Sequence, residues 1–397
     1  MKLLDFYKEF PSEEACKAHF KANREKEGVV CKRCCGLEHY WLESKSMYQC
    51  KKCERRMSLK SGTVMENSKL SFVYWYIAMH LMSATKKNVS ALEAQFQIGH
   101  AYYEPIWCMM HKLRRSMANR DEKHHLKGAI ELDEAFFVVN DPRDPEAPLK
   151  RGAGSERQAK VVVMAESTPI TDPKKGRKKY RCGYFKMFAI EDLQAETIDQ
   201  QAKNGIESES ELRTDNSKSH RGLKKLVKKH EAITLPGKEG SKVLPWVHTA
   251  ISNAKAMFLA TYHGISEGYI QNYLSEFCYK LNRRYHGERV FDRLVVAVGT
   301  EQRRALPARK VVGHGVVFQH RRVTDLARAL QHILFHSRRD GDAEGGLAHA
   351  RVERFARGHA GKTRKVRGAA KRETKRSETQ VLVRWDWRGE SAGSGAA

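Results

Sequence analysis

The chain has 397 residues, of which 41% are hydrophobic, so it is long enough for two or three domains with at least one substantial core. Lysine and arginine number 73 against 47 aspartates and glutamates, a formal net charge of +26. This excess is larger than solubility requires and indicates a polyanionic partner such as nucleic acid, although a solvated basic surface has the same composition.

No segment predicts a membrane span or a secretory leader. The longest apolar stretch, residues 70–82, contains His80 and is shorter than the roughly 20 residues that a bilayer requires. The first ten residues include Asp5 and Glu9, where a signal peptide has an uninterrupted apolar core. We therefore expect a cytoplasmic, nucleoid-associated protein without a membrane partner.

The first block, residues 1–65, contains two C-x-x-C pairs. Cys31 and Cys34 are separated by fifteen residues from Cys50 and Cys53, the spacing at which two knuckles bind one tetrahedral Zn²⁺. Such a zinc ribbon would be structural, because four protein thiolates leave no open coordination position. Cys35 directly follows Cys34 and is an alternative ligand, although its register does not suit the knuckle.

The second block, residues 67–118, has apolar residues at near-helical spacing on both sides of Gly99. The pattern predicts short helices joined around a glycine, which resemble a helix-turn-helix that binds DNA. A helical hairpin that packs on its neighbour would show the same pattern, and periodicity does not separate the two.

The third block, residues 128–296, mixes predicted strands and helices, which is typical of an α/β domain. The strands are predicted from short apolar runs, and the helices from longer periodic segments. The predicted strands are 129–139, 160–167, 182–190 and 209–217, and the predicted helices are 221–230, 249–263 and 267–284.

Acidic residues interrupt two of these strands. Asp133 and Glu134 lie in the middle of an apolar strand, and burying carboxylates without partners is costly, so a metal ion or another cation is expected there. Asp215 lies near the end of another short strand. If the two strands are neighbours, the carboxylates meet at one edge of the sheet, where Mg²⁺ or Mn²⁺ would act on a phosphodiester. Each aspartate alone is equally compatible with a structural role.

Several segments together resemble insertion-sequence transposases with an N-terminal zinc ribbon and a DDE, RNase H-like catalytic domain. They span about residues 10–296 and include CKRC, QCKKC, IELDEAFF, LRTDNSKSH and VHTAISNAKAMFLATYHGISEGYIQNYLSEFCYKLNRR. The resemblance implies a mixed five-stranded sheet flanked by helices, preceded by the zinc ribbon and a helix-turn-helix-like linker. It also implies metal-dependent cleavage at the ends of the element and strand transfer into target DNA, by a homo-oligomer that binds the terminal inverted repeats.

The resemblance also assigns residues to the catalytic site. Asp133 and Asp215 take the places of the first two Mg²⁺ ligands. The third place falls on Asn253, as in branches of the family that use asparagine with a nearby lysine, here Lys255. An amide oxygen brings no charge, so the two aspartates would supply most of the attraction for the metal.

Three further residues are candidates near this site. Glu276 is the rival third ligand, or else a surface carboxylate that pairs with Lys280 four residues on. Glu134 is a possible auxiliary carboxylate, and His248 is expected to orient the scissile phosphate or to have a local packing role.

Two other functions stay open at this point. One is a catalytically inactive DNA-binding regulator derived from a transposase, which the neutral Asn253 would allow. The other is an RNase H-like nuclease or resolvase that uses the same core to cut DNA without joining it.

The composition changes near residue 300. Residues 1–300 contain 33 lysines and 18 arginines, whereas residues 301–397 contain 5 and 17. The last segment is also rich in alanine and glycine and has few periodic apolar stretches, so we interpret residues 301–397 as a basic, disordered tail. The changed usage suggests the hypothesis of a foreign or out-of-frame coding extension.

Overall fold

The computed structural model describes residues 1–139, 155, 157–170, 180–234, 243–262 and 264–300. The tail expected over 301–397 lies outside the described residues. Within the described part, none of the helices combines the length and the apolar character needed to cross a bilayer.

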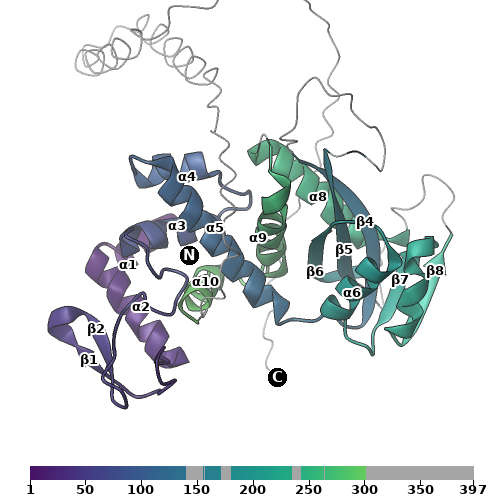
Figure 1. Ribbon diagram of the computed structural model, residues 1–397. Helices are drawn as coiled ribbons and strands as arrows, with labels where there is room; N and C mark the ends of the chain where they lie inside the picture. The colour runs from purple at the N-terminus through teal and green to yellow at the C-terminus, as the bar shows by residue number, and fades with distance from the viewer. Residues whose placement is uncertain (140–154, 156, 171–179, 235–242, 263, 301–397) are drawn as a thin grey trace, which may run out of the picture. The chain divides into compact units, whose positions relative to one another are not determined.

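Two helices precede the cysteine pairs, and the sequence patterns did not predict them (Figure 1). Ser12 begins the second helix by accepting a hydrogen bond from the backbone N–H of Ala15, and Gly28, with φ of 93°, ends it. A three-stranded antiparallel sheet follows, in the order β1-β2-β3. The elements are α1 (Leu3–Glu9), α2 (Glu13–Glu27), β1 (His39–Leu42), η1 (Glu43–Lys45), β2 (Met47–Cys50) and β3 (Arg56–Ser58).

The next block consists of helices, at the positions where the apolar periodicity predicts them. Ser71 and Ser90 each cap a helix through the side-chain oxygen. Gly99 ends the second of these helices in the left-handed conformation, with φ of 73°, which glycine adopts without strain. The helices are α3 (Phe72–Ala84), α4 (Ala91–Ile98) and α5 (Tyr103–Glu122).

A five-stranded mixed sheet forms the centre of the third block, in the order β6-β5-β4-β7-β8. Strand β5 is antiparallel to both of its neighbours, β4 and β6, whereas β7 and β8 run parallel to β4. This order and these directions are those of an RNase H-like sheet. The strands are β4 (Ala129–Val138), β5 (Gln158–Pro169), β6 (Tyr180–Ile190), β7 (Glu211–Asp215) and β8 (Lys229–Ile233).

Helices cover both faces of this sheet (Figure 1). Ala135 and Phe137 of β4 pack in one core with Val247 and Phe277, whereas Leu132 packs in another. Because side chains alternate along a strand, odd-numbered residues of β4 face α8 and α9, and even-numbered residues face α6 and η3. These elements are α6 (Ala195–Gly205), η3 (Lys218–Lys225), α8 (Pro245–Thr261), η5 (Glu267–Tyr269) and α9 (Ile270–Asn282).

The helix predicted over residues 221–230 is wrong in its second half. The 3-10 helix η3 occupies its first half, and the segment then enters β8, the fifth strand of the sheet. The error has a physical reason, because the side chains of β8 are exposed or half-buried and therefore lack the apolar alternation that marks a strand.

The last described helix, α10 (Arg289–Thr300), does not pack on the sheet. Its Phe291, Leu294 and Val298 lie in one core with Phe20 of α2 and Trp75 of α3. Most of α10 falls within residues 128–296, which the sequence assigns to the catalytic domain. That boundary does not follow the packing, because α10 completes the core of the N-terminal helices.

Candidate metal centres

Asp133 and Asp215 stand at corresponding positions of two neighbouring parallel strands. Glu131 of β4 is in register with Arg213 of β7, and each aspartate lies two residues further along its strand. Their side chains therefore leave the sheet on the same face and at the same level. This placement meets the condition on which the sequence-based site depended, namely that the two strands are neighbours.

The carboxylate of Asp133 is largely buried, with 19% of its side chain exposed. Burial is the main cause that raises the pKa of Asp133 to about 6, and the negative charges of Glu134 and Asp215 add to it. His248 of α8 acts in the opposite direction, since its Nε2 lies 3.7 Å from Oδ2 of Asp133. A bound cation would relieve the same repulsion more strongly.

A histidine that the sequence reading did not single out joins the other carboxylates. Nε2 of His220 lies 2.7 Å from Oε1 of Glu134, and its Nδ1 lies 2.7 Å from Oδ1 of Asp215. Burial by itself would lower the pKa of His220, but the hydrogen bond and charge of Glu134 and the charge of Asp215 outweigh it and raise the pKa. The imidazolium form satisfies both contacts, because both ring nitrogens then donate.

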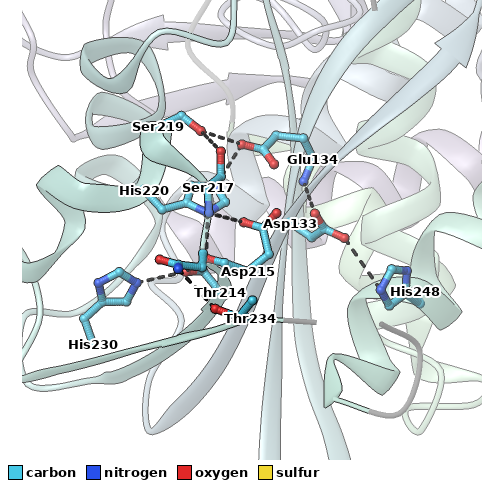
Figure 2. A network of polar contacts seen from close by, with 11 residues as sticks. Asp133, Glu134, Thr214, Asp215, Ser217, Ser219, His220, His230, Thr234 and His248 are labelled. Carbon is cyan, nitrogen blue, oxygen red and sulfur yellow. Dashed lines mark hydrogen bonds and ion pairs between the residues drawn. The ribbon is translucent and has the colours of Figure 1, made fainter. Parts of the chain in front are cut away.

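Figure 2 shows how these side chains converge from three elements. Asp133 and Glu134 come from β4, Asp215 ends β7, and His220 reaches back from η3. His248 approaches Asp133 from α8, on the side away from His220.

The donor set fits a divalent cation. One ligand atom from each of Glu134, Asp215 and His220 falls within 4.8 Å of the others. Asp133 is not part of this group, and its carboxylate contacts His248 and the backbone N–H of Glu134. Carboxylate oxygens suit Mg²⁺ and Mn²⁺. The imidazolium form of His220 has no free nitrogen lone pair, so His220 would become a ligand only after it releases a proton, and it would then favour transition metals. The cluster can therefore hold a divalent metal ion.

Asn253 and Lys255, the other proposed catalytic residues, both lie on α8. Asn253 is half-buried, and Lys255 is exposed with its Nζ 5.8 Å from the ring centre of Phe137. Five residues of α-helix turn by roughly 140°, so Asn253 leaves α8 in a different direction from His248. The residue of α8 that contacts Asp133 is His248.

Glu276 lies elsewhere, in a buried ion pair. Its carboxylate is fully buried in α9 and accepts a 2.7 Å hydrogen bond from Nε of Arg114 on α5. The expected surface pair with Lys280 is wrong, because the Lys280 ammonium donates instead to the backbone oxygen of Lys87. Glu276 therefore links α9 to α5 and is not among the residues gathered around Asp215.

The four cysteines of the two pairs form a second cluster. Sγ of Cys31 lies 3.5 Å from that of Cys53, and Sγ of Cys34 lies 3.5 Å from that of Cys50. Sulfurs around one tetrahedral Zn²⁺ lie about 3.8 Å apart, so the set fits a zinc ion. A Cβ at Gly36 would approach two of these sulfurs to 3.3 and 3.4 Å, so a side chain there would crowd the cluster.

The two knuckles repeat the same backbone geometry, which decides the place of Cys35. The N–H of Cys35 donates to the carbonyl of Cys31, and the N–H of Glu54 donates likewise to Cys50. Both Cys35 and Glu54 have left-handed φ angles, of 56° and 57°. Cys35 is thus the residue that ends the first knuckle, as Glu54 ends the second, and it stays exposed outside the cluster.

The sheet order, the helices on both faces and the carboxylates at its central parallel strands define an RNase H-like domain. Residues 125–282 match the family model described as the ISXO2-like transposase domain. This segment, which is less than half of the chain, is similar to that family of transposase domains. Among curated proteins, no sequence matches the chain.

Solved structures of Mos1 transposase complexes show a distant likeness. A pre-cleavage Mos1 transpososome is 13% identical over 54% of this chain and 75% of its own, with a TM-score of 0.22. The Mos1 strand transfer complex is 14% identical over 50% of this chain and 62% of its own, also at 0.22. The mariner Mos1 paired-end complex with Mg is 14% identical over 48% and 62%, at 0.23.

Proposed function

We propose that this chain is a DDE-type DNA transposase that cuts DNA at the ends of an insertion sequence and joins the freed 3′ ends to target DNA. The observation that carries the proposal is the pair Asp133 and Asp215, held at one level on neighbouring parallel strands of a transposase domain. A divalent cation bound there would supply Lewis acidity for activating the attacking hydroxyl and for stabilising the leaving oxygen of the phosphodiester.

The residues of the chain have distinct parts in this proposal. Asp133 and Asp215 hold the catalytic Mg²⁺ or Mn²⁺, and Glu134 is an auxiliary carboxylate. His220 orients Asp215 by binding one of its oxygens, which leaves the other oxygen for the cation. His248 lies beside Asp133, where a partly exposed imidazole is able to donate to the scissile phosphate.

The third ligand and the phosphate contact are assigned to α8. Asn253 offers an amide oxygen without charge, and Lys255 offers an exposed ammonium to the DNA backbone. Because Asn253 leaves α8 in a different direction from His248, its assignment predicts that α8 adjusts when metal and DNA bind.

The partners follow from the same function. Double-stranded DNA, as terminal inverted repeats and as target, would contact the helices of residues 67–118 and the basic zinc ribbon. Two element ends have to be cut and joined together, so the active form would be a homo-oligomer on DNA. Zinc at the four cysteines would be structural.

A strand-transfer assay tests the proposal. Purified protein is incubated with element-end DNA and a target plasmid in Mg²⁺ or Mn²⁺, and nicked and joined products are separated. We expect joined products from the wild type, and a loss of at least about 1,000-fold for Asp133→Asn or Asp215→Asn, because each removes a charged ligand. Glu211→Gln is the matched control, since Glu211 is an exposed carboxylate at the start of the same strand β7.

The products also separate the other functions. Cut ends without joining would indicate a nuclease or a resolvase. DNA binding without any cleavage in either metal would indicate the inactive regulator, and would contradict the proposed function.

A further inference from the structure

Glu131, two residues before Asp133 on β4, reaches the first turn of α8. Its carboxylate is fully buried, and Oε2 accepts hydrogen bonds from the backbone N–H groups of Trp246, at 2.7 Å, and Val247, at 3.0 Å. A carboxylate is costly to bury unless donors surround it. A helix N-terminus supplies such donors, together with a favourable dipole.

The helix α8 lacks a cap of its own. Leu244 at the N-cap position provides no side-chain acceptor, and Pro245, the first residue of the helix, has no N–H. The first backbone donors of α8 are therefore those of Trp246 and Val247, the two that Glu131 binds. Glu131 thus does from a separate strand what a serine or aspartate does at the start of most helices.

The same stretch of β4 and α8 carries the contact between Asp133 and His248. Glu131 and Asp133 are both odd-numbered residues of β4 and face α8, and His248 directly follows Val247 in the helix. Nε2 of His248 lies 3.7 Å from Oδ2 of Asp133. The contact of Glu131 with the first turn of α8 therefore lies next to the contact of His248 with Asp133, both along β4 and along α8.

We propose that Glu131 is a positioning residue for the metal centre: by binding the first turn of α8 it sets His248 against Asp133. It acts through α8 and is not a ligand itself. The inference rests on the proposed function in one respect, because it takes Asp133 to be a metal ligand.

Glu166 on the adjacent strand β5 provides a matched control. It is also a buried strand carboxylate that accepts two backbone N–H groups, from Lys127 at 3.1 Å and Tyr184 at 2.8 Å. Those donors belong to the segment before β4 and to β6, so Glu166 supports the sheet and not α8. Removing either carboxylate is expected to lower stability, but only the change at Glu131 should disturb α8.

The test compares Glu131→Ala, Glu131→Gln and Glu166→Ala in the full chain. Hydrogen exchange reports on the first turn of α8, and electron paramagnetic resonance reports on Mn²⁺ binding without any DNA. For Glu131→Ala we expect exchange at residues 246–248 to accelerate at least about tenfold, and the Kd for Mn²⁺ to rise about tenfold. Glu131→Gln keeps one acceptor and should fall between this variant and the wild type. Glu166→Ala should change neither readout.

Several outcomes would overturn the proposal. One is unchanged exchange of α8 in Glu131→Ala or, if that variant does not fold, in Glu131→Gln. Another is an equal rise of the Mn²⁺ Kd in Glu166→Ala, which would reduce Glu131 to general support of the fold. A failure of the proposed function would give a different result. Asp133→Asn would then leave Mn²⁺ binding unchanged, although Glu131→Ala would still accelerate hydrogen exchange in α8. That result would overturn the metal role and leave the anchoring of α8 standing.

Discussion

At the scale of single residues, the main feature of the site is that several carboxylates lie close together. Asp133, Glu134 and Asp215 lie close together at the centre of the sheet, and their mutual repulsion has to be compensated. His220 supplies a positive charge to two of them, and His248 lies beside the third. A divalent cation would complete this compensation.

The first prediction concerns the pH dependence of metal binding. The pKa of Asp133 is raised to about 6, mainly by burial, so a proton competes with the metal for this carboxylate below that pH. Between pH 7.5 and pH 5 we expect the Kd for Mn²⁺ to rise roughly tenfold from this group alone, because about one molecule in ten keeps Asp133 ionised at pH 5. Titration calorimetry measures this, and Asp133→Asn should flatten the profile. An equally steep profile in Asp133→Asn would show that another group is responsible.

The second prediction concerns His220. Its raised pKa means that the stability it contributes is present below the pKa of about 6.5 of an unfolded histidine and is lost as the pH rises through the folded value. We expect His220→Gln to lower the free energy of unfolding by about 2 kcal/mol at pH 6, less than for a fully buried pair because Asp215 is partly exposed. At pH 9 the difference from the wild type should shrink.

Urea denaturation at both pH values measures this effect. His230→Gln is the matched control, since among the described residues His230 on β8 contacts the Thr214 hydroxyl at 2.9 Å and no carboxylate. A difference that is the same at pH 6 and pH 9 would show that His220 acts by packing alone.

At the scale of elements, contacts between residues that are distant in the sequence stabilise the small structural units. The zinc knuckles are an example, because each pair of cysteines is joined in space to the other pair across the β1–β2 hairpin. Each knuckle has two basic residues between its cysteines and so contributes little apolar surface, and the metal is expected to supply much of the stability of this unit.

The third prediction concerns zinc. We expect one zinc ion per chain, released by a mercurial reagent and measured with a colorimetric chelator. Cys50→Ser should lose the zinc and unfold the small sheet, because Cys50 is fully buried among the four sulfurs. Cys35→Ser should keep the zinc, since Cys35 lies outside the cluster. Loss of zinc from Cys35→Ser would contradict the geometry of the first knuckle.

At the scale of the whole molecule, the last described helix packs against the first helices of the chain. After the sheet and its helices, α10 packs against α2 and α3 and completes a core that starts at Phe6. The N-terminal helices therefore depend on residues almost three hundred positions away. The domain limit at residue 296 falls inside α10 and would cut through this core.

The fourth prediction uses two truncations. A chain that ends at Thr300 keeps α10, and we expect it to cut and join DNA as well as the full chain or better. A chain that ends at Gly287 lacks Phe291, Leu294 and Val298, and each lost core side chain costs on the order of 2–5 kcal/mol. We expect its N-terminal helices to lose cooperative unfolding, as followed by circular dichroism. Loss of all joining in the longer truncation would show that residues 301–397 are required.

Local patterns in the sequence were sufficient for some features because their signals lie within a few residues. The cysteine spacing, the acidic residues inside apolar strands and the glycine between periodic helices all belong to this kind. Asp133 and Asp215 were proposed in this way, and their strands are neighbours, which is the condition that the prediction required.

Only the tertiary structure shows the contacts of His220, Glu131 and Glu276. His220 lies in a polar stretch and becomes significant through burial between two carboxylates, and Glu276 finds its cation on a helix 162 residues away. Strand β8 and helix α10 belong to the same group, because their place depends on which surface they cover. The physical reason is that burial and pairing with distant residues set the charge state and the orientation of a side chain. Neither burial nor such pairing can be inferred from the residues next to it in the sequence.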